Sequence, residues 1–186
     1  MTTKSVLDQC GCRTTRRRLL GGAAALAGFT LAGCLGGDAG TTDPVEVPTD
    51  AECAVCKMKP ANYPEWNAQL AFDDGDRAYF CSPGCLVAYH AKPGTFTEGR
   101  SWEDVAGVWA HDYDSKELFD AESGVFVLEM NPDRIDAPMM RNPVPFAERA
   151  DAEAYADQYD DLTTDDIVTL DAFDVELASK YRGKLL

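Results

Sequence analysis

The sequence has little of what nucleic-acid binding and the common hydrolytic enzymes require. Its 186 residues include 17 Lys and Arg against 32 Asp and Glu, which gives a formal net charge of −15. Phosphate backbones are bound by clustered basic side chains, so we do not expect nucleic acid as a partner. The sequence also has no Gly-rich phosphate loop, no H-E-x-x-H helix and no Ser, His and Asp in a hydrolase order. Hydrolytic and nucleotide chemistry therefore have no support, and we expect a protein that is not an enzyme.

The sequence also has no apolar run of the length that crosses a bilayer, about 20 residues. Its most apolar stretch, residues 21–33, follows Arg16 and Arg17 and ends in Leu-Ala-Gly directly before Cys34. An arginine pair, a short apolar run and this final motif together predict a twin-arginine lipoprotein signal over residues 1–33. A single membrane anchor or a disordered tail is the alternative.

Cleavage of this signal makes Cys34 the first residue of the mature protein and the site of lipid attachment. We therefore expect an exported protein that is lipid-anchored to the outer face of the cytoplasmic membrane. Removing residues 1–33 leaves 12 basic and 31 acidic residues and a formal charge of −19. The acidic residues are scattered along the chain, which is typical of a solvated, halophilic protein surface rather than of a specific cation site.

The number and spacing of the cysteines limit the possible functions further. Of seven cysteines, Cys10 and Cys12 leave with the signal and Cys34 is blocked by lipid. Two closely spaced pairs remain, and such pairs can converge on one metal ion in tetrahedral geometry. The alternatives are two structural disulfides, or a redox dithiol, which is expected beside a β-α-β pattern that the sequence lacks. The remaining pairs are Cys53 and Cys56, in a C-x-x-C motif, and Cys81 and Cys85, in a C-x-x-x-C motif.

Strand and helix patterns predict an α+β fold. Residues 34–50 are rich in Gly, Pro and Thr without an apolar period, which predicts a flexible, lipidated spacer. Residues 67–72 alternate in polarity and are joined to residues 77–80 by Asp-Asp-Gly-Asp, which predicts a β-hairpin. After the hairpin, Ser82 can cap a helix that has Pro83 at its first position.

That helix, expected over residues 84–92, places Cys81 at the end of a strand and Cys85 in the first helical turn. A helix N-terminus lowers the pKa of a thiol toward the thiolate that metals bind. The second half repeats the order of strands and helix, so we expect two tandem ββα(β) modules. They are a Cys-rich module over residues 51–105 and a second αβ module with a C-terminal helix over residues 106–186. The further strands are expected at residues 108–113, 125–130, 144–146 and 167–170, and the further helices at residues 150–159 and 172–181.

Methionines shift the expected metal from zinc toward copper(I). Met58 follows Cys56 by two residues and lies on the same side of the chain if the segment is extended. Thiolate and thioether ligands together select copper(I), whereas zinc rarely binds Met. A Pro-rich loop in the second half carries Met139 and Met140. A single Met is more often core filler than ligand, but two Met-bearing loops in corresponding halves favour copper(I), with zinc as the alternative.

Short motifs follow one another in a fixed order over most of the chain after the spacer. They are Cys-Ala-Val-Cys-Lys-Met at 53–58, Trp-Asn-Ala-Gln at 66–69, Asp-Tyr at 112–113, Phe-Val at 126–127, Ala-Pro-Met at 137–139 and Pro-Phe-Ala at 145–147. In this order they resemble the NosL family, copper-binding accessory lipoproteins of nitrous oxide reductase maturation in denitrification. The resemblance implies a two-module αβ fold and copper(I) delivery to a copper reductase. It implies ligand roles for Cys56, Met58 and Met139.

The first half of the mature chain carries a second likeness. Residues 53–96, with Tyr-Phe-Cys-Ser-Pro-Gly-Cys, also resemble the YHS and TRASH metal-binding modules, which favours Cys81 and Cys85 as ligands. Two positions depart from the NosL pattern. Lys57 stands where Gly is usual between the second Cys and the Met, and Met140 stands where Gly is usual after Pro-Met.

The two histidines, His90 and His111, are expected to be structural. His90 lies near the end of a predicted helix, where its charge complements the helix dipole. His111 lies in a predicted strand and is held in reserve as a ligand.

The leading functional hypothesis is a membrane-anchored copper(I) metallochaperone. Its partners would be a copper-receiving exported reductase, such as nitrous oxide reductase, and a membrane copper transporter. One alternative is an extracytoplasmic lipoprotein whose structural zinc site supports a binding module. The other is a thiol oxidoreductase that uses Cys53 and Cys56.

Overall fold

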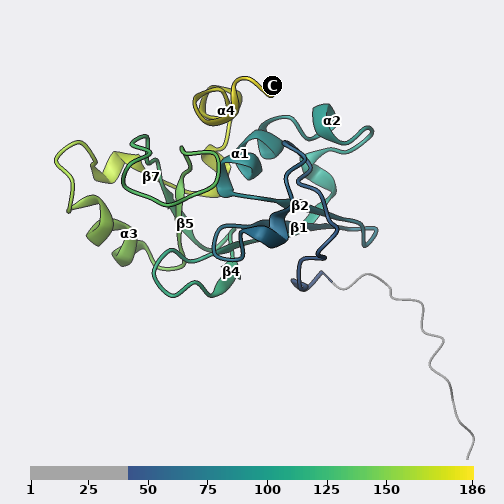
Figure 1. The fold of residues 1–186 in the computed structure, drawn as a ribbon, viewed down its shortest axis with the longest axis horizontal. Coiled ribbons are helices and arrows are strands. Elements are labelled where there is room, and N and C mark those ends of the chain that lie inside the picture. Colours follow the sequence, from purple (N-terminus) through teal and green to yellow (C-terminus); the bar gives the residue numbers. More distant parts are fainter. Residues whose placement is uncertain (1–41) are drawn as a thin grey trace, which may run out of the picture. The chain divides into compact units, whose positions relative to one another are not determined.

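The computed structural model describes residues 42–186 (Figure 1). The predicted export signal and Cys34 lie outside these residues. Within residues 42–186, no helix has both the length and the apolar character needed to cross a membrane.

The first half of the described chain forms a four-stranded antiparallel sheet. Its strand order is β2-β1-β3-β4, so the β-hairpin of β1 and β2 is extended on its β1 side by β3. The central strand β1 is buried along its whole length, with Leu70 facing Ala78 on one side and Val108 on the other. Gly75, at φ 90°, allows the left-handed backbone of the hairpin turn. The strands are β1 (Ala68–Phe72), β2 (Arg77–Phe80), β3 (Val105–His111) and β4 (Leu118–Asp120).

The second half forms a three-stranded antiparallel sheet with β5 in the centre. Its order is β6-β5-β7, and β5 and β6 are buried at every position. Helix α3 (Arg149–Ala156) packs on this sheet through Tyr155, whose ring contacts those of Phe146 and Tyr113. The strands are β5 (Val125–Val127), β6 (Val144–Phe146) and β7 (Ile167–Val168).

Helix α1 (Pro83–Ala91) is buried by elements from both ends of the chain. Residues 83–89 are all buried, as expected for a helix that is apolar around its whole circumference. Its neighbour α4 (Val175–Arg182) comes from the C-terminal end and lies beside it (Figure 1). The remaining helical segments are the short helix α2 (Pro93–Phe96) and the 3-10 turns η1 (Pro60–Asn62), η2 (Trp102–Asp104), η3 (Thr164–Asp166) and η4 (Leu170–Ala172).

The predicted α+β class is confirmed, while the partition of the strands differs from the expected tandem modules. The boundary expected at residues 105/106 would assign β3 and β4 to the second module, but both belong to the first sheet. Pairing with β1 lets Val108 and Ala110 bury their side chains in the first core. If β3 belonged to a separate second sheet, the first core would lose this cover. Likewise α4, expected to close the second module, packs on α1 of the first.

The end of the expected spacer is attached to the first sheet. The Gln69 side chain accepts a hydrogen bond from Val45 N at 3.0 Å and donates one to Val45 O at 2.8 Å. Arg77 donates a further bond to the carbonyl of Asp43. Because Gln69 is itself buried in β1, these bonds place residues 43–45 along the sheet.

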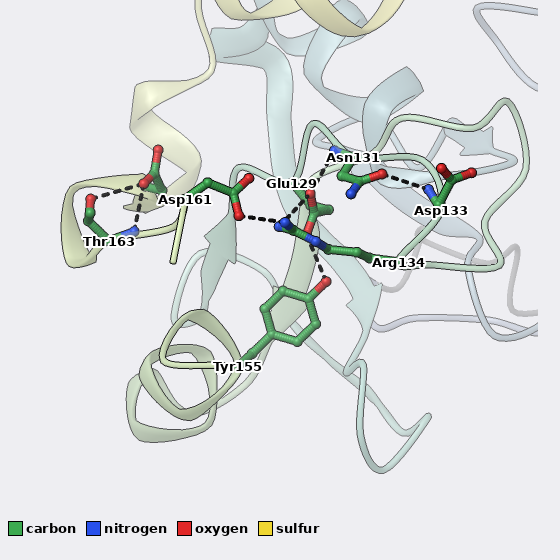
Figure 2. A network of polar contacts seen from close by, with 8 residues as sticks. Glu129, Asn131, Asp133, Arg134, Tyr155, Asp161 and Thr163 are labelled. Atoms are coloured by element: carbon green, nitrogen blue, oxygen red, sulfur yellow. Dashed lines mark hydrogen bonds and ion pairs between the residues drawn. The ribbon is translucent and has the colours of Figure 1, made fainter. Parts of the chain in front are cut away.

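A buried carboxylate joins the elements of the second half. Figure 2 shows Glu129 between Arg134 and Tyr155, with Asp161 approaching the Arg134 guanidinium as well. Glu129 is 1% exposed, accepts a 3.0 Å hydrogen bond from the Tyr155 hydroxyl and a 2.7 Å bond from Asn131 N. Burial raises the pKa of Tyr155, so its hydroxyl stays protonated and donates.

We expect the Glu129→Ala substitution to lower the free energy of unfolding by about 3 kcal/mol, because it leaves the Tyr155 hydroxyl and the Arg134 guanidinium without their buried acceptor. Chemical denaturation of the fragment 42–186 measures the change. Glu98→Ala, on an exposed loop, is the matched control and should change stability by less than about 0.5 kcal/mol. Equal effects of the two substitutions would contradict a structural role for the Glu129 network.

Candidate metal centre

The C-x-x-C motif lies in a tight loop that is fixed against β2. Cys53 N donates to Met58 O at 2.7 Å, and Lys57 N donates to Cys53 O at 3.1 Å, so the loop closes on itself. Ala54 N then donates to the carbonyl of Tyr79 in β2 at 2.9 Å. These bonds bring the first cysteine pair to the end of the hairpin.

The second pair spans the junction of β2 and α1. Cys81 directly follows the last residue of β2, and Cys85 lies in the first turn of α1. Ser82 occupies the predicted N-cap position with Pro83 at the first helical position, but the Ser82 side chain makes no capping hydrogen bond. Its hydroxyl instead accepts a hydrogen bond from Arg182 at 2.8 Å, which is a correction to the predicted cap.

The four cysteines predicted as ligands converge on one point. All four Sγ atoms lie within 4.8 Å of one another, with Cys56 and Cys81 3.3 Å apart and Cys81 and Cys85 3.7 Å apart. None of the four is in a disulfide. In a tetrahedral site with metal–sulfur bonds of about 2.3 Å, sulfur atoms lie about 3.8 Å apart, so the cluster has the size of a four-sulfur metal site. Among residues 42–186 it is the one group of three or more Cys, His or acidic side chains with this geometry.

The cluster is buried except at one edge. Cys53, Cys81 and Cys85 are 0% exposed, whereas Cys56 is partly exposed. Hydrogen bonds from Cys56, Cys81 and Cys85 lower the pKa of Cys53, against the opposing effect of burial. The hydrogen bond with Cys53 raises the pKa of both Cys81 and Cys85, with burial acting in the same direction. A metal ion that binds all four must therefore displace protons from the latter two.

The predicted methionine ligands lie at different distances from the cluster. Met139 Sδ is 4.0 Å from Cys85 Sγ, so the second Met loop does reach the cysteines. Met140 is 66% exposed and turned to solvent, while Met58 is partly buried against the first core. The ligand roles of all three methionines stay predictions.

Three residues of the two loops have left-handed backbone conformations. Lys57 has φ 65°, Met139 φ 63° and Met140 φ 67°. Lys57 and Met140 are the positions at which the family pattern has Gly, the residue that adopts this conformation without strain. The two departures from the pattern therefore preserve the loop backbone while changing the side chain.

Two polar residues around Cys85 were not foreseen as part of the site. Arg182, from the last turn of α4, donates Nε–H to Cys85 Sγ at 3.3 Å. Asn142 accepts hydrogen bonds from Arg182 at 2.7 Å and from Gly84 N at 3.0 Å. Sequence reasoning missed Arg182 and Asn142 because each is distant from the cysteines along the chain, and a basic residue at a helix end is expected there for its dipole alone.

Neither histidine joins the cluster. His90 forms a 2.6 Å hydrogen bond through Nδ1 with the carbonyl of Phe173 and lies against the Trp102 ring. His111 bonds the carbonyl of Lys116 through Nδ1 and the side chain of Asn67 through Nε2. Both rings thus connect elements of the fold.

Comparison with known proteins agrees with the fold. The family model described as NosL matches residues 44–167. The chain belongs to the NosL family. The crystal structure of the copper chaperone NosL from Shewanella denitrificans aligns with a TM-score of 0.57 at 18% identity, over 73% of this chain and 98% of that one. At this identity the likeness establishes the NosL fold. No curated protein matches the sequence. The match to the NosL family ends at residue 167, before α4 begins.

The exposed edge of the cluster predicts selective reactivity of Cys56. Its hydrogen bond with Cys53 raises its pKa and those with Cys81 and Cys85 lower it, with a resulting pKa of about 7. In the reduced, metal-free fragment we expect Cys56 to be alkylated first, at a rate that rises about tenfold per pH unit below pH 7 and levels above it. Peptide mass spectrometry after timed iodoacetamide pulses measures this rate.

Urea-unfolded protein is the control, in which all four cysteines should react alike with a midpoint near the free-thiol pKa of about 8.5. Labelling of Cys53 or Cys85 ahead of Cys56 in the folded protein would contradict this geometry.

Proposed function

We propose that the protein is a lipid-anchored copper(I) metallochaperone that delivers its ion to an exported copper enzyme such as nitrous oxide reductase. The observation that carries the proposal is the convergence of four cysteine sulfurs with the Met139 thioether 4.0 Å from one of them. Membership of the NosL family supports the same function.

The sulfur set favours copper(I) as cargo. Four thiolates alone suit zinc as well as copper(I), because both accept tetrahedral sulfur ligation. The thioether within reach of Cys85 distinguishes the two ions, since zinc rarely takes Met and copper(I) binds it readily. No hard oxygen ligand belongs to the cluster within residues 42–186.

The arrangement also suits transfer. Three sulfurs are fully buried and hold the ion away from water, while Cys56 and Met139 lie at the accessible edge. Met139 is neutral and 37% exposed, so it is the ligand that a partner's soft side chain displaces at least cost. We infer that copper(I) leaves by stepwise ligand exchange at this edge, and that a lipid on Cys34 keeps the protein near its copper source and its client.

The second candidate is a structural zinc site in a binding module. It is favoured by the position of Cys53, Cys81 and Cys85 inside the first hydrophobic core, where a permanently bound ion would stabilise the fold. The thiol oxidoreductase has less support, because Cys53, its required partner thiol, is fully buried within a four-thiol cluster.

Metal competition separates copper(I) from zinc. Under anaerobic conditions the reduced fragment should hold copper(I) against a copper(I) chelator, and Cys81→Ser should lose about 100-fold or more in affinity. Met139→Leu should lose about tenfold for copper(I) and nothing for zinc, because only copper(I) uses the thioether.

Met130→Leu is the matched control, because Met130 is also partly buried against the first core and, within residues 42–186, has no hydrogen bond with a cysteine sulfur. Equal losses for zinc and copper(I) in the Met139 variant would favour the structural zinc site.

Membrane anchoring is tested in cells by Cys34→Ser, which removes the sulfur that lipid modification requires. We expect the variant to leave the membrane fraction, or to accumulate as the uncleaved precursor. Cys10→Ser, within the predicted signal, is the control and should fractionate like the wild-type protein. A Cys34 variant that remains processed and membrane-bound would refute the lipoprotein assignment.

A further inference from the structure

Arg182 makes the most extensive polar contacts of any residue near the cysteine cluster. Its Nε–H donates to Cys85 Sγ at 3.3 Å, and each Nη1 hydrogen has a carbonyl acceptor, of Arg141 and of Tyr181, both at 2.8 Å. The two Nη2 hydrogens go to Ser82 Oγ at 2.8 Å and Asn142 Oδ1 at 2.7 Å. All five N–H donors of the guanidinium are therefore used, which fixes its position.

This guanidinium is buried and has no carboxylate partner in the described part of the chain. Arg182 is 3% exposed, and its acceptors within residues 42–186 are two carbonyls, a hydroxyl, an amide and a sulfur. A buried charge with neutral partners alone costs several kcal/mol, so buried arginines are normally paired with an anion. Of these acceptors, the Cys85 sulfur is the one that can carry negative charge.

The sequence makes room for this contact at Gly84. A Cβ at this position would lie 2.6 to 2.8 Å from the Arg182 guanidinium, closer than atoms approach one another. The glycine between Ser82 and Cys85 therefore lets the guanidinium reach the start of α1. Gly84 belongs to the C-x-x-x-C segment and Arg182 to α4. Two distant parts of the chain therefore both contribute to the contact between the guanidinium and the start of α1.

We propose that Arg182 is the counter-charge of the metal centre and a specificity-determining residue for copper(I) over zinc, an inference that rests on the proposed function. With the same set of deprotonated cysteines, a copper(I) complex carries one more unit of negative charge than a zinc complex. A fixed positive charge in a buried site stabilises the more negative complex more strongly. Arg182 acts through Cys85 and is a positioning residue rather than a ligand.

The experiment compares Arg182→Gln, Arg182→Lys and Gly84→Ala with wild type in the fragment 42–186. Arg182→Gln removes the charge, Arg182→Lys keeps a charge without the fork, and Gly84→Ala displaces the guanidinium while keeping it in the chain. We expect Arg182→Gln to lower copper(I) affinity about 10- to 100-fold in chelator competition, and zinc affinity by a smaller factor. Arg182→Lys should recover part of the loss, and Gly84→Ala should resemble Arg182→Gln.

Lys180→Gln is the matched control. It removes the same charge from the same helix, but Lys180 is exposed and paired with Glu176 on the surface, so both affinities should stay at the wild-type values. A cobalt(II) probe adds a readout that a purely structural role would not move. Loss of the N–H···S bond to Cys85 should shift the thiolate-to-cobalt charge-transfer bands in Arg182→Gln, and Lys180→Gln should leave them unchanged.

The outcomes distinguish this inference from the proposed function. If the wild-type protein binds zinc but not copper(I), the proposed function is overturned. In that case the zinc affinities still test the counter-charge, which requires wild type to bind zinc more tightly than Arg182→Gln. Wild type that binds copper(I) no more tightly than folded Arg182→Gln overturns the inference alone. If Arg182→Gln does not fold, as judged by circular dichroism, Arg182→Lys and Gly84→Ala are compared with wild type instead. Wild-type metal affinities in Gly84→Ala would then overturn the inference.

Discussion

The junction between β2 and α1 is the constraint on which the rest of the structure depends. Cys81 and Cys85 stand on either side of this junction, so a change in where the strand ends or the helix begins would separate their sulfurs. The β1–β2 hairpin sets the end of β2, and the loop of residues 53–58 bonds to Tyr79 in the same strand. The first sheet thus serves as the rigid support that the four-sulfur site needs.

Elements from the far end of the chain close the site. Helix α4 buries the outer face of α1 and brings Arg182 to Cys85, while the loop between β5 and β6 brings Met139 to the same sulfur. The tandem arrangement expected from the sequence would have kept these elements in a separate module. Because these elements pack against α1 and Cys85, the candidate metal centre is built from both halves of the described chain, and α4 lies beyond the family match.

Features that depend on residues close together in the sequence could be predicted, whereas contacts between residues far apart in the sequence could not. The four cysteines, the hairpin and the start of α1 were predictable because their signals are local: residue spacing, turn residues and Pro83 at the helix start. The placement of β3 was not, because the apolar pattern of Val108 and Ala110 suits any sheet with an open edge. Arg182 could not be predicted either, since its partner Cys85 lies 97 residues away and helix-end arginines are common.

The Met loop illustrates how backbone strain and side-chain chemistry are reconciled at the site. Met139 and Met140 both have left-handed backbones, which costs about 1 to 3 kcal/mol for residues other than glycine. Asn142 holds this loop, because its Nδ2 donates to Pro138 O at 2.8 Å while its Oδ1 accepts from Gly84 and Arg182. The hydrogen bonds that fix the guanidinium beside Cys85 therefore also fix the thioether of Met139. The Arg182 guanidinium and the loop that carries the Met139 thioether are consequently both held beside Cys85 by Asn142.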